Sequence, residues 1–237
     1  MSDAPKTYWT EANCLPFGQY MKEVELAFVR RYAGMPAAGR SLLDVGCGDG
    51  DFATELTRDG FRATGLERDS SALDVARARH PDLTVVRSDA LVMPFPDATF
   101  DVVTGVQMID YFPDKETFFA EVYRVLKPGG MMIVQVSNRR SIKGILYRTY
   151  LKLKRRTRTA WYYLKTYGEQ ARLIRETGFE ILGTLGYNWN VLQRQTRSRV
   201  IVHVYRFVET ACLLSRLPWL SPSILIAARK PMDAAGP

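Results

Sequence analysis

The segment that most constrains how this chain folds is an apolar run that ends in closely spaced glycines. Residues 42–50 are Leu-Leu-Asp-Val-Gly-Cys-Gly-Asp-Gly. A buried strand that stops at glycines and continues as a helix makes a tight turn, where a ligand can approach bare backbone and the free N–H groups of the helix. A dinucleotide-binding turn would place its third glycine at position 51, which is Asp51 here. Asp44, just before the turn, would repel a pyrophosphate and suits an ammonium group.

Around this turn, the spacing of apolar residues predicts alternating strands and helices. Strands are expected at residues 41–45, 62–66, 83–87, 100–104 and 131–136, with helices at 18–33, 52–58, 71–80 and 115–126. Ser71 and Asp74 form a predicted capping box, and Pro128-Gly-Gly is expected to end the last of these helices. Five strands that alternate with helices predict an α/β fold with a parallel sheet and right-handed crossovers.

The rest of the chain follows a different pattern. We expect a helix at 168–177, a strand at 179–185, a long apolar helix at 191–217 and a last strand at 223–228. Arg206, Glu209 and Arg216 interrupt the apolar helix, which argues against a membrane span and favours a packed helix.

Length and cysteine content favour one intracellular domain. The chain has 237 residues, which suits a single α/β domain with added elements over residues 1–237. No secretory leader is expected in the polar first residues. The three cysteines are scattered, so neither a disulfide framework nor a zinc site is predicted, and no other ligand cluster suggests a metal. A reducing cytoplasm is the expected setting.

Two further acidic residues follow predicted strands. Glu67 comes at the end of the second strand, where a carboxylate can accept both hydroxyls of a ribose; the alternative is an exposed strand-end acid. Asp89 and Ala90 follow the third strand and could meet the edge of an adenine, although an aspartate there also serves as a turn or cap residue.

These motifs together resemble a known family. LLDVGCGDG, GLERD, SDA, PFPDATFDVV and RVLKPGG, in this order and spacing, are similar to the class I S-adenosylmethionine (SAM) dependent methyltransferases, and most similar to the small-molecule group that includes the ubiquinone and sterol types. The likeness covers residues 42–136 and returns weakly at 167–180 and 224–229. It implies a Rossmann-like, doubly wound, seven-stranded sheet whose last strand is antiparallel. It also implies SAM, converted to S-adenosylhomocysteine, bound over the carboxyl ends of the strands.

The resemblance also implies roles for individual residues. Asp44, Gly46 and Gly48 would hold the methionine part, Glu67 the ribose, Arg68 the adenine face, Asp89 and Ala90 the adenine edge, and Gln107 would lie beneath the sulfonium. Arg68 departs from the family pattern, in which an apolar residue is common. Tyr8 and Trp9 are candidates to close over the cofactor or to anchor the N-terminal segment.

Three residues are candidates for catalysis. His203, on the apolar helix, is a candidate base for a hydroxyl acceptor, with core packing as the alternative. Asp110 and Tyr111 follow the fourth strand, at the mouth where acceptors bind in the family, and either could orient an acceptor.

The acceptor is the open question. The net charge is +8, yet residues 139–165 alone contribute +10 through ten Lys or Arg and no acid, so the remainder carries −2. This basic insert could contact anionic lipid at the inner membrane face, grip an anionic substrate, bind RNA, or be a solvated helix face. We predict that residues 138–166 and 188–220 form a helical cap over the acceptor site.

The expected function is methyl transfer by in-line displacement to a small-molecule or lipid-like acceptor, at oxygen. The alternatives are an RNA or protein methyltransferase that docks through the basic insert, and a SAM-binding module without turnover. Residues 107–111, Gln-Met-Ile-Asp-Tyr, lack the motif of amino-DNA methyltransferases, and no dedicated RNA-binding module is recognised, so nucleic acid ranks below a small molecule. The oligomeric state stays open.

Overall fold

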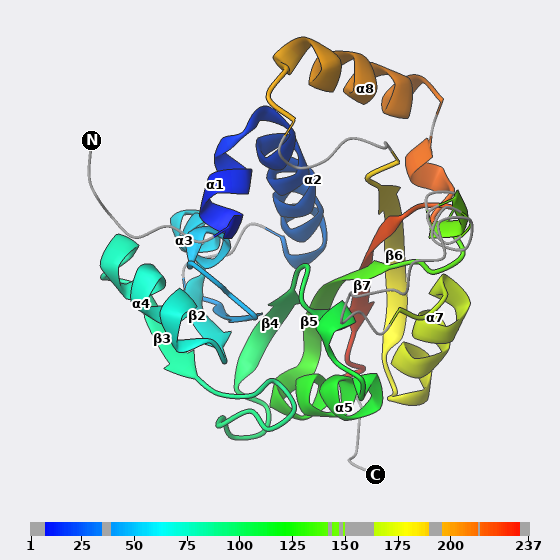
Figure 1. Ribbon diagram of the computed structural model, residues 1–237. Coiled ribbons are helices and arrows are strands. Elements are labelled where there is room, and N and C mark those ends of the chain that lie inside the picture. Colours follow the sequence, from blue (N-terminus) through cyan, green and yellow to red (C-terminus); the bar gives the residue numbers. More distant parts are fainter. Residues whose placement is uncertain are drawn as a thin grey trace.

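One seven-stranded sheet organises the molecule, with strand order β3-β2-β1-β4-β5-β7-β6 (Figure 1). The computed structural model describes residues 8–34, 39–141, 144–146, 149, 164–189, 196–212 and 214–232. The strands are β1 (Ser41–Val45), β2 (Arg62–Glu67), β3 (Thr84–Arg87), β4 (Phe100–Gly105), β5 (Leu126–Ser137), β6 (Glu180–Tyr187) and β7 (Ser223–Arg229). Only β7 pairs antiparallel with its neighbours, β5 and β6. The predicted doubly wound fold with an antiparallel last strand is confirmed.

Helices cover both faces of this sheet (Figure 1). They are α1 (Tyr8–Cys14), α2 (Pro16–Ala33), α3 (Asp51–Arg58), α4 (Ser70–Arg79), α5 (Lys115–Val125), α7 (Tyr167–Glu176) and α8 (Arg199–Ala211), with short 3₁₀ turns η1 (Ile109–Tyr111) and η2 (Leu214–Arg216). One buried cluster joins the sheet to α5 and α7, and a second joins its other face to α2 and α3.

The central strands contribute side chains to both buried clusters. Val103 of β4 belongs to the cluster with α5, whereas its neighbour Val102 belongs to the cluster with α2. Successive side chains of a strand point to opposite faces, so a strand covered on both sides places apolar residues at consecutive positions. This is why β1 contains Leu42-Leu43 and β4 contains Val102-Val103.

Two predicted helix-ending signals are wrong, although the predicted helix bounds lie within one residue of the observed ones. The N-cap of α4 is Asp69, whose carboxylate accepts the N–H groups of Ser71 and Ala72, and not the predicted Ser71–Asp74 box. Asp69 stands one residue before the helix and reaches two free donors, which Ser71 inside the helix cannot do. Likewise α5 ends at Val125, before Pro128-Gly-Gly, because the chain enters β5 directly and these residues occupy an irregular stretch of its pairing with β4.

The predicted long helix at 191–217 is shorter in the structure. α8 has 13 residues, and the Ser198 hydroxyl caps it by accepting the N–H of Ile201. Residues 190–195 lie outside the described part. Among the residues that the structure describes, no helix has both the length and the apolar character needed to cross a bilayer.

Most of the predicted basic insert also lies outside the described residues, namely 142–143, 147–148 and 150–163. Its two ends are described and they meet. The N–H of Arg139 donates to the carbonyl of Lys165 at 3.1 Å, and that of Asn138 donates to the carbonyl of Pro222 at 3.0 Å. The insert therefore leaves and rejoins the domain at one place, beside the start of β7.

Candidate active site

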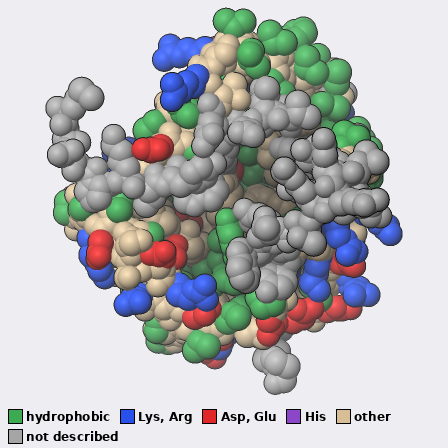
Figure 2. Space-filling model, viewed as in Figure 1, with side chains coloured by type: hydrophobic (Ala, Val, Ile, Leu, Met, Phe, Trp, Pro, Cys, Tyr) green, Lys and Arg blue, Asp and Glu red, His purple; other side chains and the backbone are tan. Residues whose placement is uncertain are grey.

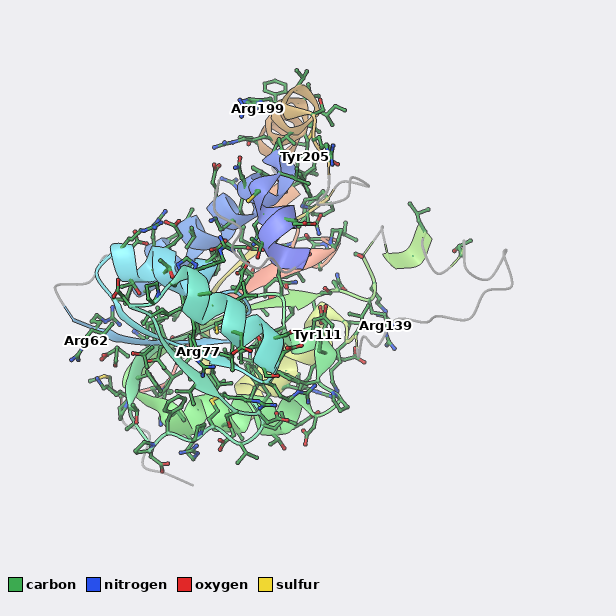
Figure 3. All side chains as sticks on the ribbon, turned by 60° about the vertical axis from the view of Figure 1, so that its left-hand side comes forward. Arg62, Arg77, Tyr111, Arg139, Arg199 and Tyr205 are labelled. Atoms are coloured by element: carbon green, nitrogen blue, oxygen red, sulfur yellow. The ribbon has the colours of Figure 1, made fainter. Side chains whose placement is uncertain are left out.

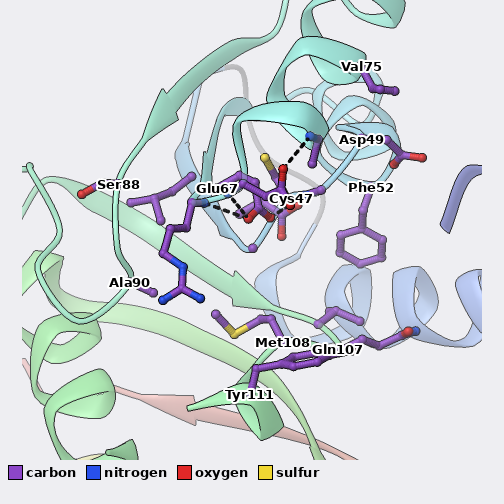
Figure 4. Close-up of a pocket in the computed structure, with 18 of the residues that line it drawn as sticks. Cys47, Asp49, Phe52, Glu67, Val75, Ser88, Ala90, Gln107, Met108 and Tyr111 are labelled. Carbon is purple, nitrogen blue, oxygen red and sulfur yellow. Dashed lines mark hydrogen bonds between the residues drawn. The ribbon is translucent and has the colours of Figure 1, made fainter. Parts of the chain in front are cut away.

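A cavity of about 670 Å³ opens at the carboxyl ends of β1, β2 and β4 (Figure 4). The sheet order reverses between β1 and β4, and in open α/β sheets this switch point is where ligands bind. The turn after β1, the end of β2, the loops after β3 and β4, and the helices α1 and α2 contribute its walls. The described residues of 138–166 and 188–220 are not among those that line it.

All eight predicted cofactor residues line this cavity. They are Asp44, Gly46, Gly48, Glu67, Arg68, Asp89, Ala90 and Gln107. They come from four loops that are up to 63 positions apart in the sequence, and parallel pairing of β2, β1 and β4 brings the ends of their strands to one edge.

The glycines of the turn have different structural roles. Gly46 and Cys47 donate N–H groups to the carbonyl of Leu66, at 2.7 and 3.1 Å, which ties the turn to the end of β2. Gly46 has φ +69°, and a Cβ there would lie 2.8 Å from Cβ of Met108. Gly48 has φ +54°, and a Cβ on it would meet nothing within 4 Å. Gly46 is therefore needed for packing, while Gly48 leaves open space at the cavity wall.

Asp44 is a buried carboxyl group at the base of the cavity. Thr104 of β4, its neighbour in the sheet, donates its hydroxyl to Oδ1 of Asp44 at 2.8 Å. Burial raises the pKa of Asp44 to about 7; the Thr104 hydrogen bond lowers the pKa and the Glu67 charge raises it further. A cationic ligand group beside Asp44 would relieve this cost, because an opposite charge favours the ionised form.

Glu67 is held in place by backbone donors. Its carboxylate accepts the N–H groups of Gly48 at 3.1 Å, Arg68 at 2.8 Å and Asp69 at 3.0 Å. The side chain thus joins the turn after β1 to the turn after β2 and is fixed in orientation at the cavity wall (Figure 4).

Arg68 and Asp89 face each other at the mouth. Nη1 of Arg68 lies 3.5 Å from Oδ2 of Asp89, and both side chains are exposed to solvent. The other oxygen of Asp89 accepts the N–H of Leu91 at 2.9 Å, so the carboxylate also fixes its own turn. Ala90, the next residue after Asp89, is buried and lines the cavity.

A buried carboxylate that the sequence analysis missed stands behind Gln107. Nε2 of Gln107 donates to Oε1 of Glu25 at 2.6 Å, and the hydroxyl of Tyr187 donates to the same oxygen at 2.8 Å. Gln107 has φ +62°, a backbone conformation that turns it toward α2. The signal that could have found Glu25 is its position four residues after Met21, which places an acid on the buried face of the predicted helix.

The structure brings one of the three catalytic candidates to the cavity. Tyr111 lines it, whereas Asp110 and His203 are not among the lining residues. Asp110 is buried in η1, where it accepts the N–H of Ser137 at 3.4 Å. Nζ of the buried Lys115 donates to the carbonyls of Ile109 and Phe112, which fixes this turn.

His203 lies on the exposed surface of α8. Its Nδ1 is 2.8 Å from the carbonyl oxygen of Arg199, one turn earlier in the same helix. The side of α8 that faces α2 carries Tyr205 and Glu209 instead, so the imidazole points away from the domain.

α1 closes one side of the cavity. The hydroxyl of Thr10 donates to Oδ2 of Asp49 at 2.5 Å, and Nη1 of Arg79 lies 3.2 Å from the same oxygen. This contact docks α1 on the glycine turn and leaves Asn13 in the cavity wall. The side chains of Tyr8 and Trp9 lie outside the described residues.

The family model described as a methyltransferase domain matches residues 43–134, the stretch that holds the glycine turn and the loops after β2, β3 and β4. Residues 43–134 therefore form a methyltransferase domain of the class I SAM-dependent kind.

Individual relatives match about two fifths of this chain. It is 42% identical over 108 residues to the 2-methyl-6-phytyl-1,4-hydroquinone methyltransferase of Synechocystis, covering 43% of this chain and 33% of the relative. It is 41% identical over 100 residues to a fatty-acid O-methyltransferase of Mycolicibacterium smegmatis, covering 40% and 36%. The matched stretch therefore spans about a third of the length of these relatives.

A solved structure supports the fold of the methyltransferase over a longer stretch. Phosphoethanolamine N-methyltransferase 2 of Haemonchus contortus, solved with SAM, superposes with a TM-score of 0.62 over 88% of this chain and 52% of that one, at 20% identity.

SAM is the cofactor of this methyltransferase family, and the cavity fits it. A buried carboxyl group whose hydrogen-bond partner is a neutral hydroxyl suits the ammonium of the methionine part. The open space at Gly48 admits a ligand against bare backbone. Among the described residues, no group of His, Cys, Asp or Glu is placed to hold a metal ion.

Proposed function

We propose that this chain transfers a methyl group from SAM to a small-molecule or lipid-like acceptor, at an oxygen atom. The observation that carries the proposal is that one cavity has two different walls. Figure 4 shows Gln107, Met108 and Tyr111 on the side opposite Cys47 and Glu67. A wall with aromatic and apolar side chains and a few polar groups is typical of a small-molecule site.

The wall around β1 and β2 would hold the cofactor. Asp44 would bind the ammonium, Glu67 the ribose hydroxyls, and Asp89 with Ala90 the adenine edge, with Arg68 against its face. Bound there, SAM supplies a methyl group on a positively charged sulfur. The chain's own contribution is alignment and the exclusion of water, since a carboxylate fixed by three N–H groups needs no rearrangement on binding.

The opposite wall would hold the acceptor. An acid acceptor is ionised at neutral pH and needs no base, whereas a hydroxyl must lose its proton. Glu25 is the carboxylate on this wall, and its hydrogen bond from Gln107 fixes its position, so we assign proton removal to Glu25 and orientation to Tyr111. The fatty-acid and phytyl-hydroquinone methyltransferases among the relatives support an acceptor with an apolar body, and the fatty-acid O-methyltransferase supports transfer to oxygen.

The test is the transfer of labelled methyl from SAM into fractionated cell extract. The best inactivating variant is Gly48→Asn, because asparagine tolerates φ +54° and its side chain would occupy the open space at the cavity. Gly46→Arg is less suitable, since its Cβ would strike Met108 and disturb the fold. The matched control is Gly168→Asn, whose Cβ also meets nothing within 4 Å.

We expect label in the lipid or small-molecule fraction with the wild type and with Gly168→Asn, and none with Gly48→Asn. Label in the RNA or protein fraction would overturn the proposal in favour of docking through residues 139–165. Bound SAM without label in any fraction, across extracts of several sources, would instead indicate a module without turnover.

A further inference from the structure

α8 presents apolar side chains to solvent. Val200 and Phe207 are each 73% exposed and Val204 is 59% exposed, with Ile201 and Val208 beside them. These positions recur at three- and four-residue intervals, so they form one continuous face of the helix. Figure 2 shows the hydrophobic side chains gathered at the top of the molecule, over α8. Large exposed apolar patches mark interaction sites.

The opposite side of α8 is fixed to α2 by polar groups. The buried carboxylate of Glu209 accepts the hydroxyls of Tyr20 and of Tyr205, the latter at 3.0 Å. The Tyr205 hydroxyl in turn accepts the N–H of Trp189 at 2.9 Å. Figure 3 shows Tyr205 where α8 meets α2 and Arg199 away from that contact. α8 cannot roll its apolar face inward without leaving a buried carboxylate and two hydroxyls unpaired, which is costly.

The charges around this face are mostly positive, and the neighbouring exposed acid is Glu23 of α2, which lies 3.7 Å from Arg206. Between residues 196 and 220 the charged side chains are four arginines, Arg197, Arg199, Arg206 and Arg216, and one acid, Glu209. The arginines are exposed and Glu209 is buried. Glu23 offsets the charge of Arg206, so Arg197, Arg199 and Arg216 give this surface its net positive charge. Trp219, which follows η2, is 54% exposed.

We infer that this α8 face (Val200, Ile201, Val204, Phe207 and Val208, with Arg197, Arg199, Arg216 and Trp219) docks on a bilayer that carries anionic headgroups. A helix with an apolar face, a cationic border and a nearby tryptophan lies in the plane of a membrane interface, with its apolar side among the acyl chains. The arginines complement anionic headgroups. A second copy of the chain is a poorer occupant, because a symmetric contact through this face would set the same arginines against each other.

This surface deepens the proposed function and rests on it for its purpose, since a bilayer is where a lipid-like acceptor resides. α2 connects the two sites. Its Tyr20 holds α8 through Glu209, and its Lys22 and Glu25 line the cavity. Only α2 therefore separates α8, the proposed membrane-docking helix, from the acceptor wall of the cavity. Vesicle binding itself does not require methyl transfer, so the two proposals can fail separately.

The experiment is flotation of the full chain with vesicles of phosphatidylcholine alone or of phosphatidylcholine and phosphatidylglycerol in equal parts. The disrupting variant is Val200→Glu, and the matched control is Val92→Glu, because Val92 is 72% exposed on a different part of the surface. Each variant adds one acid at an exposed valine, so neither should unfold the protein. Circular dichroism melting of both variants checks this directly.

We expect the wild type and Val92→Glu to float with the anionic vesicles and not with phosphatidylcholine alone. Val200→Glu should bind the anionic vesicles at least tenfold more weakly. Equal flotation of both variants, or no flotation of the wild type, would overturn the inference. Concentration-dependent dimers of the wild type that Val200→Glu abolishes, without vesicle binding, would assign the face to a second copy and would also overturn it.

Discussion

The cavity side of the sheet and the α8 side each bury a carboxyl group, but the two groups have different surroundings. Asp44 has one neutral hydroxyl as its partner and lies beside the open space at Gly48. Glu209 is enclosed between α2 and α8 and accepts two tyrosine hydroxyls. Burial raises the pKa of both acids. The difference teaches that a buried acid indicates a ligand site only where there is room for the ligand; otherwise it fixes one helix on another.

Helices α5 and α8 differ in where their apolar faces point. On α5, Phe118, Val122 and Val125 are fully buried against the sheet. On α8, the corresponding apolar face points to solvent, and among its described residues only Val202 and Glu209 are buried. Helical periodicity identifies an apolar face in both, but not what covers it.

The largest expected effect contrasts two phenylalanines. Phe118→Ala should lower the free energy of unfolding by about 3–5 kcal/mol, because it leaves a cavity in a packed core. Phe207→Ala should change it by less than about 0.5 kcal/mol, because the ring is exposed. Urea unfolding of both variants measures the difference. A comparable loss of unfolding free energy for Phe207→Ala would show that the α8 face is covered in solution. It would contradict the contrast between the buried face of α5 and the exposed face of α8.

The next effect concerns Asp44 and pH. Its pKa of about 7 in the folded protein lies above its value of about 3.9 in the unfolded chain. Its protonation therefore stabilises the free protein below about pH 4, and this contribution is lost as the pH rises to about 7. An ammonium ligand needs the ionised form, whose fraction rises from about 1% at pH 5 to about half at pH 7, so SAM affinity should rise about fiftyfold over this range.

Calorimetric titration across this pH range, with the stability measured in parallel, tests the Asp44 prediction. Asp44→Asn removes the titrating group and should flatten both profiles while binding SAM weakly at every pH. Glu209→Gln is the matched control, since Glu209 is outside the cavity, and its SAM affinity should keep the wild-type pH profile. A pH profile unchanged in Asp44→Asn would contradict the assignment of Asp44 to the ammonium.

A smaller effect is expected at the anchor of α8. Glu209→Ala should cost about 1–3 kcal/mol, because it leaves the hydroxyls of Tyr20 and Tyr205 buried without this acceptor. Hydrogen exchange should show loss of protection along α8 and unchanged protection in α5. Glu176→Ala, at an exposed ion pair with Arg172, controls for the loss of an acid. Equal loss of protection in α5 would mean that α8 is not a separable element.

The smallest effect is expected away from both sites. Arg58 pairs with Glu55 at 2.9 Å, three residues earlier on α3, and its side chain is well exposed. Arg58→Ala should change the unfolding free energy by about 0.5 kcal/mol or less, because solvent screens such pairs. A thermal melt suffices to measure it. A larger change would mean that the surface charge of α3 contributes to the fold in a way that the pair geometry does not explain.

The sequence by itself determined the strand and helix alternation of the domain and the loops that carry the cofactor residues. Asp44, Glu67 and Asp89 each follow or end a strand, and parallel pairing brings such positions to one edge whatever the details of packing. Local rules were less reliable where two nearby residues compete for one role, as Asp69 and Ser71 do at the start of α4.

Only the tertiary structure decided the rest of the site. Glu25 meets Gln107 and Tyr187 across 82 and 162 positions, and no local pattern encodes such a contact. Asp110 is adjacent to Tyr111, yet one serves a buried turn and the other lines the cavity. His203 and Glu209 share α8, yet His203 is exposed and Glu209 is buried against α2. Residue spacing fixes which side chains share a face of an element, whereas the direction of that face depends on how elements far apart in the sequence pack together.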